Sequence, residues 1–254
     1  QRNSISVLVQ RVSDNSNYYP QRCVINLNRK FRHLFLYITL LCCMKILIVV
    51  FISFGFMFTQ NDGWEMVKEA NNTKVYTRKT SASDYEQIRI VTKVQAPISE
   101  IVNALEDVNY HQEWVYETKE TKLLEKRGVG DFEYYALMNM PFPVKDRDII
   151  IGVKRSQDPN SKVVDIKSFA LLNKMPEQSK RIRIKTFLST YKISPLDNGW
   201  VEVDYFMAAD PGGKLPAWIV NMFTVKGPVA TMESMVELID SDYYKGKKVE
   251  GIID

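Results

Sequence analysis

The stretch that decides the fold is LPAWIVNMFTVKGPVATMESMVELI, residues 215–239. Its bulky apolar side chains recur at alternating steps of four and three residues, which is the period of one face of an α-helix. Gly227 and Pro228 interrupt it, and a proline removes one main-chain hydrogen bond and clashes with the preceding turn. The sequence predicts a long amphipathic helix with a kink there, either a hinge or a fixed packing feature. The apolar stripe consists of Trp218, Met222, Val225, Val229, Met232, Val236 and Ile239.

Upstream of this helix the pattern is that of strands, because apolar residues alternate with polar ones and turn-forming clusters separate the segments. A second helix is expected from Pro97, with Ile98, Ile101 and Leu105 on one face, and a short one at 62–71. The order of elements predicts an α+β domain in which a curved antiparallel sheet wraps around the C-terminal helix. The expected strands are 74–79, 86–94, 115–124, 131–139, 147–155, 162–169, 180–192 and 200–208.

A basic stretch, KRIRIK at 180–185, lies in one of these strands. We expect its basic side chains on a solvated strand face, paired across a hairpin with Glu202 and Asp204 of the next strand. A patch for anionic headgroups is the alternative interpretation.

The sheet and the helix both present bulky apolar groups, and if they do not close fully on each other they enclose a cavity lined by hydrocarbon. The same spacing also fits a plain packed core, so alternation alone leaves both interpretations open. The candidate cavity residues are Phe132, Tyr134, Ala136, Met138, Ile149, Ile151, Val153, Tyr205, Met207, Trp218, Met222, Val225, Val229 and Met232.

The formal net charge of +4 is concentrated at the front of the chain. Residues 1–43 carry a net charge of +5, and the remaining residues carry −1. No basic stripe is left on the body of the protein, so a nucleic-acid partner is not expected.

An apolar segment at 34–58 follows this basic region, with Lys45 as its one charge, and it is long enough to span a bilayer. Read from Met44, the chain has a charged start, an apolar run at 46–58 and a polar continuation, which is the pattern of a secretory signal peptide. We expect export to the periplasm or the extracellular space from this signal, with residues 1–43 as an upstream, non-structural segment.

Two alternatives to the signal peptide stay open. One is an uncleaved anchor at 34–58 with Arg29, Lys30 and Arg32 on the cytoplasmic side, and the other is a buried core helix. Residues 59–254 contain no linker or repeat and are expected to form one domain, with its core at about 62–241.

Two motifs of this domain resemble the START (StAR-related lipid transfer) domain family: PFPVKDRDIII at 141–151 and DPGGKLPAWIVNMF at 210–223. The resemblance covers about residues 62–241 and includes the order of elements. It implies a helix-grip fold whose cavity holds one lipid or other hydrophobic molecule, for non-vesicular transfer or sensing. The C-terminal helix and a neighbouring strand loop would act as a lid, with transient membrane contact. We expect a monomer.

The first motif contains the pair Arg147-Asp148. We expect this pair to form a salt link that ties the turn to the rim of the sheet rather than to contact the ligand. Sterol-binding members of the family resemble the chain at this pair but carry a second arginine six residues after the first, and here that position is Val153. This difference argues against a sterol as the ligand of the cavity.

Beyond residue 58 the chain has no cysteine and one histidine, His111. This composition excludes a disulfide framework, a Cys/His zinc site and a cysteine nucleophile from the domain. His111 lies beside Trp114 and is expected to be a surface or capping residue. We expect no catalysis, metal or cofactor. The alternatives are an enzyme acting on a hydrophobic substrate, of the cyclase or hydrolase kind and with His111 as its base, and a membrane-tethered interaction domain with a packed core.

Overall fold

A computed structural model of the chain describes residues 63–81 and 83–254. The segment 1–43 and the signal or anchor expected at 34–58 lie outside the described residues. Within the described residues, no helix combines the length and the apolar character needed to cross a bilayer.

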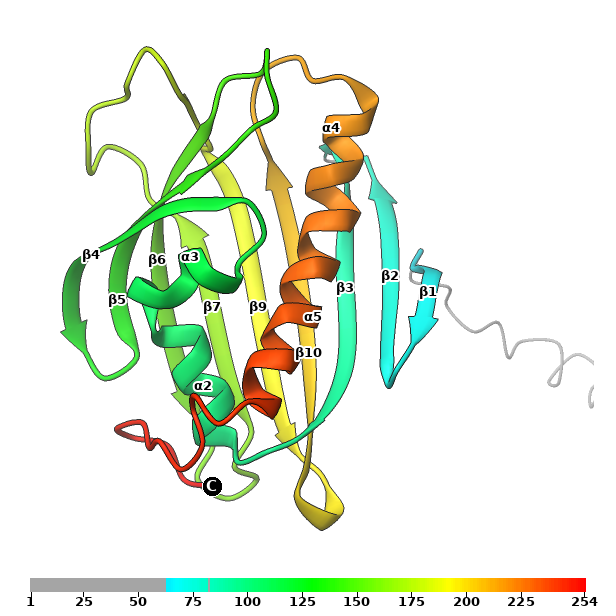
Figure 1. Cartoon of the computed structure of the whole chain (residues 1–254), viewed down its shortest axis with the longest axis vertical. Helices are drawn as coiled ribbons and strands as arrows, with labels where there is room; N and C mark the ends of the chain where they lie inside the picture. Colours follow the sequence, from blue (N-terminus) through cyan, green and yellow to red (C-terminus); the bar gives the residue numbers. More distant parts are fainter. Residues whose placement is uncertain (1–62, 82) are drawn as a thin grey trace, which may run out of the picture. The chain divides into compact units, whose positions relative to one another are not determined.

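A ten-stranded sheet, antiparallel except where β8 pairs with β6, is the framework of the described residues (Figure 1). Its strand order is β1-β2-β3-β10-β9-β7-β6-β5-β4, with β8 beside β6. The strands are β1 (Glu65–Ala70), β2 (Thr73–Thr80), β3 (Ser83–Gln95), β4 (Thr118–Gly128), β5 (Asp131–Met138), β6 (Arg147–Gln157), β7 (Val164–Ala170), β8 (Ile182–Arg183), β9 (Thr186–Pro195) and β10 (Trp200–Asp210).

The sheet curves around a set of helices on one of its faces, with α5 crossing the middle strands and α2 and α3 beside it (Figure 1). This arrangement confirms the expected helix-grip α+β fold. The helical elements are α2 (Ile98–Glu106), the 3₁₀ turn η1 (Val108–Tyr110), α3 (His111–Trp114), the 3₁₀ turn η2 (Asp197–Gly199), α4 (Ala217–Asn221), the π-helical η3 (Met222–Lys226) and α5 (Gly227–Asp240).

The main core lies between the sheet and the helices and follows the expected periods. On β3, Ile88 and Ile90 are fully buried, while Arg89 between them points outward and pairs with Asp204 of β10 at 2.6 Å. The helix α2 contributes Ile101, which is also fully buried. Side chains that alternate on a strand and recur every third or fourth residue on a helix therefore meet in one apolar layer.

The C-terminal helix runs from Ala217 to Asp240 as the consecutive elements α4, η3 and α5. Its irregularity is the π-helical segment Met222–Lys226, which leads directly into Gly227 and Pro228, and both Lys226 and Gly227 keep helical dihedral angles. A wider turn of this kind is a known way for a helix to accommodate a proline. The expected interruption is therefore present as a π turn just before Gly227; a hinge motion stays a prediction.

The expected helix at 62–71 is wrong, because this segment forms the edge strand β1, which pairs with β2. The two-residue loop between them consists of Asn71 and Asn72, both with positive φ, at 47° and 62°. Such a pair closes a tight hairpin, and asparagine tolerates this conformation better than most residues. All six residues of β1 are exposed. Because the strand has no buried face, its sequence, EMVKEA, shows no alternation of apolar and polar residues that would predict a strand.

The basic stretch 180–185 also differs from the expectation, because it does not form the hairpin strand opposite Glu202 and Asp204. Ile182 and Arg183 instead form the short strand β8, parallel to the start of β6. Arg183 is 7% exposed and binds both carboxylate oxygens of Asp148, at 2.8 and 2.9 Å. This buried ion pair holds the segment beside β6, and the strand that does pair with β10, β9, begins only at Thr186.

The segment after α5 packs against α2 and extends the core beyond the expected boundary at 241. Tyr244 is fully buried and donates from its hydroxyl to Asp107 Oδ2 at 3.0 Å. Asp254 accepts from the main-chain N–H and the hydroxyl of Ser99, at 2.7 and 2.8 Å. These contacts fix the segment after α5 to both ends of α2.

Candidate functional site

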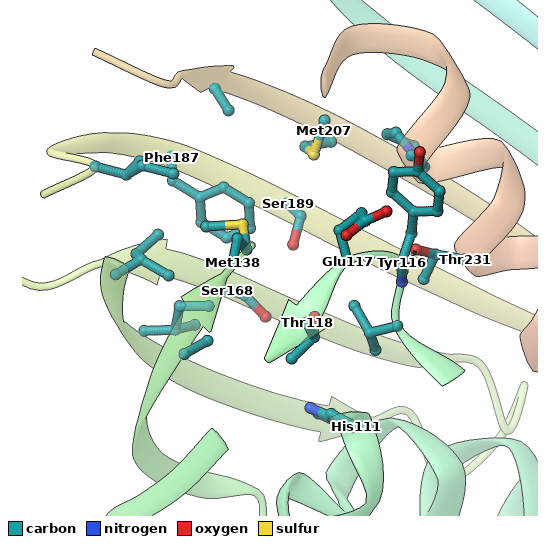
Figure 2. A pocket seen from close by; sticks show the side chains of 18 of the residues that line it. His111, Tyr116, Glu117, Thr118, Met138, Ser168, Phe187, Ser189, Met207 and Thr231 are labelled. Atoms are coloured by element: carbon teal, nitrogen blue, oxygen red, sulfur yellow. Dashed lines mark hydrogen bonds between the residues drawn. The ribbon is translucent and has the colours of Figure 1, made fainter. Parts of the chain in front are cut away.

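A cavity of about 210 Å³ lies between the concave face of the sheet and the first half of the C-terminal helix (Figure 2). Strands β5, β6, β7, β9 and β10 form its floor, and α3 closes one side. The loop at residues 115–117, between α3 and β4, and the segment Met222–Thr231 of the helix also belong to the wall. Further lining residues are Leu105, Thr118, Thr121, Asn139, Met140 and Ile184.

Nine of the fourteen candidate residues line this cavity: Tyr134, Ala136, Met138, Ile149, Ile151, Val153, Tyr205, Met207 and Met222. The strand register explains why they meet. Tyr134 lies opposite Ile151, and Ala136 lies opposite Ile149, in the β5–β6 pair. Directly opposed residues point to the same face, so alternate positions of both strands face the helix. Gly227 and Pro228 also line the cavity.

The other five candidates are not part of the cavity wall. Phe132, Val229 and Met232 are buried in the main core, and Val225 packs against that core. Trp218 is 56% exposed at the start of α4. A π-helical turn contains more residues than an α-helical turn, so it rotates the residues that follow it about the helix axis. A 3.6-residue period continued through residues 222–226 therefore predicts the wrong residues to face the cavity.

Strands β7 and β9 also line the cavity, although none of their residues was among the candidates. They add Ile166 and Ser168, and Phe187, Ser189 and Tyr191. Strand alternation could have found them, since they recur at every second position. Nothing in the sequence marked the 115–117 loop, whose place in the wall depends on long-range packing.

Hydroxyl groups interrupt the apolar lining. Ser168 and Ser189 are paired in register across β7 and β9, and Figure 2 shows both side chains directed into the cavity. Tyr191 and Tyr205 are likewise paired in register, with ring centroids 4.6 Å apart. Burial raises the pKa of Tyr134, Tyr191 and Tyr205 above the usual value of a phenol, so all three stay neutral.

His111 lies in the cavity wall, so its expected place as a surface or capping residue is wrong. It is 6% exposed and packs edge-on against the rings of Trp114 and Tyr134, with centroids 5.5 and 5.6 Å away. Its Nε2 lies 3.2 Å from the carbonyl oxygen of Leu105. Burial lowers its pKa to about 4, which makes the imidazole neutral at pH 7.

The 115–117 loop is attached to the C-terminal helix at the point of its irregularity. The main-chain N–H of Tyr116 donates to Thr231 Oγ1 at 3.1 Å. A Cβ atom at Gly227 would lie 3.2 Å from the Tyr116 ring, so the glycine permits this close packing. Glu117 has a positive φ of 51°, and its carbonyl oxygen accepts from the main-chain N–H of Asn139 at 2.8 Å.

Arg147 and Asp148 lie outside the cavity wall and connect the sheet to neighbouring segments. Arg147 is 1% exposed and donates to the carbonyl oxygens of Pro211, Gly212 and Lys145. Asp148 pairs with Arg183. The expected salt link between the turn and the rim is thus replaced by hydrogen bonds to main-chain carbonyls and a separate ion pair.

Comparisons with known proteins agree with this geometry. The sequence model of the START domain matches residues 57–241. An uncharacterised protein of Pseudomonas aeruginosa is 30% identical over 175 residues, which cover 68% of this chain and 85% of that protein. The phosphatidylcholine transfer protein of Rattus norvegicus is 23% identical over 186 residues, which cover 72% of this chain and 86% of that protein.

Among solved structures, a fragment of a STAR-related lipid transfer protein from Xanthomonas axonopodis superposes with a TM-score of 0.65 at 25% identity. The match covers 71% of this chain and all of that fragment. The family match spans most of the described residues, which also form the helix-grip fold and the cavity between sheet and helix. The chain belongs to the START domain family.

Proposed function

We propose that the protein binds one lipid or other hydrophobic molecule in this cavity and transfers it between membranes, without catalysis. The observation that carries this proposal is the largely apolar cavity between the concave face of the sheet and the C-terminal helix. Exposing a lipid chain to water costs about 0.8 kcal/mol per CH₂, so a sixteen-carbon chain faces about 12 kcal/mol. A protein that encloses such a chain offsets this cost during passage through water.

The cavity is smaller than a lipid with two acyl chains requires. Pockets for drug-sized ligands measure about 300–1,000 Å³, and this cavity measures about 210 Å³. A lipid with two acyl chains therefore requires the wall to move outward. The 115–117 loop and the helix segment around Gly227 are the parts of the wall that can move without breaking strand pairs.

Transient membrane contact is part of the proposal, because large apolar side chains are exposed on two loops and on the first turn of α4, at one end of the sheet. Phe142 is 95% exposed between β5 and β6, Leu172 is 55% exposed after β7, and Trp218 is 56% exposed where α4 begins. Figure 1 shows these loops at the same end, beside α4. Aromatic side chains favour the interface between lipid and water.

The lowered pKa of the His111 imidazole supports a function of the protein without catalysis. A general base works best with a pKa near the working pH, and burial holds that of His111 at about 4. Its contact with the carbonyl oxygen of Leu105 is a local main-chain interaction. We therefore assign it to the cavity wall and not to a catalytic step.

Export from the signal starting at Met44, and a monomeric state, also belong to the proposal. Both rest on the sequence. Cell fractionation followed by N-terminal sequencing distinguishes a cleaved signal from an anchor at 34–58, and sedimentation equilibrium tests the monomer.

The decisive experiment is mass spectrometry of the purified protein after denaturing extraction, which should release a stoichiometric hydrophobic molecule. Ala136, 8% exposed in the cavity wall, supplies the variant: Ala136→Trp fills the space and should abolish lipid capture. The matched control is Leu123→Trp, at a position that is 42% exposed on β4 and outside the wall. An empty wild-type protein that also transfers no lipid between vesicles would overturn the proposal.

A further inference from the structure

We propose that the cavity selects lipids whose polar group is uncharged, that is, a hydroxyl, ester or amide, over lipids that carry a phosphate. Diacylglycerol is the simplest probe of the favoured class. This inference rests on the proposed function, because it assumes that a lipid occupies the cavity at all.

The first observation is the charge of the wall. Among the residues that line the cavity there is no lysine, no arginine and no aspartate, and His111 is neutral. Glu117 is the one acidic side chain in this set, and it lies in the 115–117 loop at the exposed side of the wall. A buried phosphate would find no cation, and one near Glu117 would face a like charge. Desolvating an unpaired ion is far more costly than desolvating a hydroxyl.

The second observation is that the two arginines buried among the described residues, Arg147 and Arg183, have other partners. Arg147 donates hydrogen bonds to the carbonyl oxygens of Lys145, Pro211 and Gly212, and Arg183 binds Asp148 through two hydrogen bonds. Lys226 lies with its Nζ 5.7 Å from the centre of the Tyr116 ring, and its side chain is not part of the wall. Releasing either arginine for a phosphate would break a buried polar contact of the fold itself.

The third observation is the supply of neutral hydrogen-bonding groups inside. Ser168 and Ser189 place two hydroxyls side by side on neighbouring strands (Figure 2). At the α3 side of the wall, Trp114 is 9% exposed, and its buried Nε1–H has no hydrogen-bond partner among the described residues. A hydroxyl or carbonyl of a ligand can pair with such groups without leaving a charge unpaired.

The test is a vesicle-to-vesicle transfer assay with the full-length chain and three probes that share the same pyrene-labelled acyl chains. The probes are diacylglycerol, phosphatidic acid and phosphatidylcholine, and spontaneous transfer is subtracted with a protein-free sample. We expect diacylglycerol to be transferred at least about tenfold faster than either phospholipid, a ratio that corresponds to about 1.4 kcal/mol. Equal or faster transfer of a phospholipid would overturn the selectivity and leave the transfer function intact. Transfer of none of the three by a protein that also carries no co-purified hydrophobic molecule would overturn the proposed function instead.

One double variant and one pair of single variants locate the selectivity in the wall. Replacing both serines, Ser168→Ala with Ser189→Ala, should weaken diacylglycerol binding about three- to tenfold and leave a pyrene-labelled alkane unaffected. Unchanged diacylglycerol binding in this variant would contradict the assigned role of the hydroxyls. Val153→Lys places a cation in the wall and should raise phosphatidic acid transfer relative to diacylglycerol, whereas the uncharged Val153→Met should not. If Val153→Lys fails to fold, the wild-type probe series and the serine variant still decide the question.

Discussion

Arg147 donates from Nη2 to the carbonyl oxygen of Gly212, at 3.0 Å and across 65 residues of sequence. This bond joins the two motifs that carry the resemblance to the START family, because one contains the arginine and the other the glycine turn. Gly212 adopts a positive φ of 72°, which points its carbonyl toward the arginine at little steric cost. The contact thus ties the first residue of β6 to the turn that leads into the C-terminal helix.

Removing this contact should destabilise the fold. Arg147→Met leaves three main-chain carbonyls without a donor at a position only 1% exposed, and we expect a loss of about 3 kcal/mol in the free energy of unfolding. Urea denaturation measures it. The matched control is Lys154→Met, at an exposed position of the same strand, which should change stability by less than about 0.5 kcal/mol. Equal effects of the two substitutions would contradict a structural role for Arg147.

Releasing the 115–117 loop from the helix should accelerate lipid exchange. Thr231→Val removes the acceptor of the Tyr116 N–H, a bond worth about 1 kcal/mol, so we expect the exchange rate to rise about fivefold. Thr231→Ser keeps the hydroxyl and should behave as the wild type. Stopped-flow transfer of a pyrene-labelled lipid gives the rate. A rate that is the same in the valine and serine variants would show that this loop does not limit opening.

Removing the exposed aromatic side chains should impair delivery without impairing binding. Phe142→Ala combined with Trp218→Ala deletes two apolar contacts with a bilayer, and we expect transfer between vesicles to slow by about tenfold or more. Lipid occupancy measured by mass spectrometry should stay unchanged, because neither residue lines the cavity. Met66→Ala with Val67→Ala, on the exposed edge strand β1, controls for the general loss of surface apolar area. Slower transfer in both double variants would argue against docking at this end.

The buried imidazole should make stability depend on pH. The pKa of His111 is about 4 in the folded protein, against about 6.5 for an unperturbed histidine, so the unfolded chain binds more protons between these values. Stability therefore falls as the pH is lowered from 6.5 to 4, by about 3 kcal/mol from this group. Urea denaturation of the wild type and of His111→Gln across this range measures it. The stability difference between them should shift by this amount in favour of the variant; a constant difference would contradict the assignment.

The periodic elements could be predicted from the sequence because their signals are local. Ile88 and Ile90 alternate with Arg89 on β3, and the apolar steps of 215–239 match a helix, so both elements are visible in short windows. The burial of a side chain could not be predicted where it depends on a contact with a residue far away in the sequence. Arg183 is identical in pattern to a solvated strand residue, and only its pairing with Asp148, 35 residues away, buries it. His111 likewise has the pattern of a surface residue, and its contact with the ring of Tyr134, 23 residues away on β5, could not be predicted locally.

The sequence by itself determined the fold class, the family resemblance and most of the strand faces that line the cavity, since these depend on residue spacing and on motifs such as the Gly212-Gly213 turn. The tertiary structure decided which apolar residues enclose space and which fill it. Met222 lines the cavity while Val229 and Met232 belong to the packed core, although all three lie on one predicted stripe. The periodicity of a sequence predicts which face of a helix or strand is apolar. Whether two such faces touch or stay apart depends on long-range contacts that set their separation.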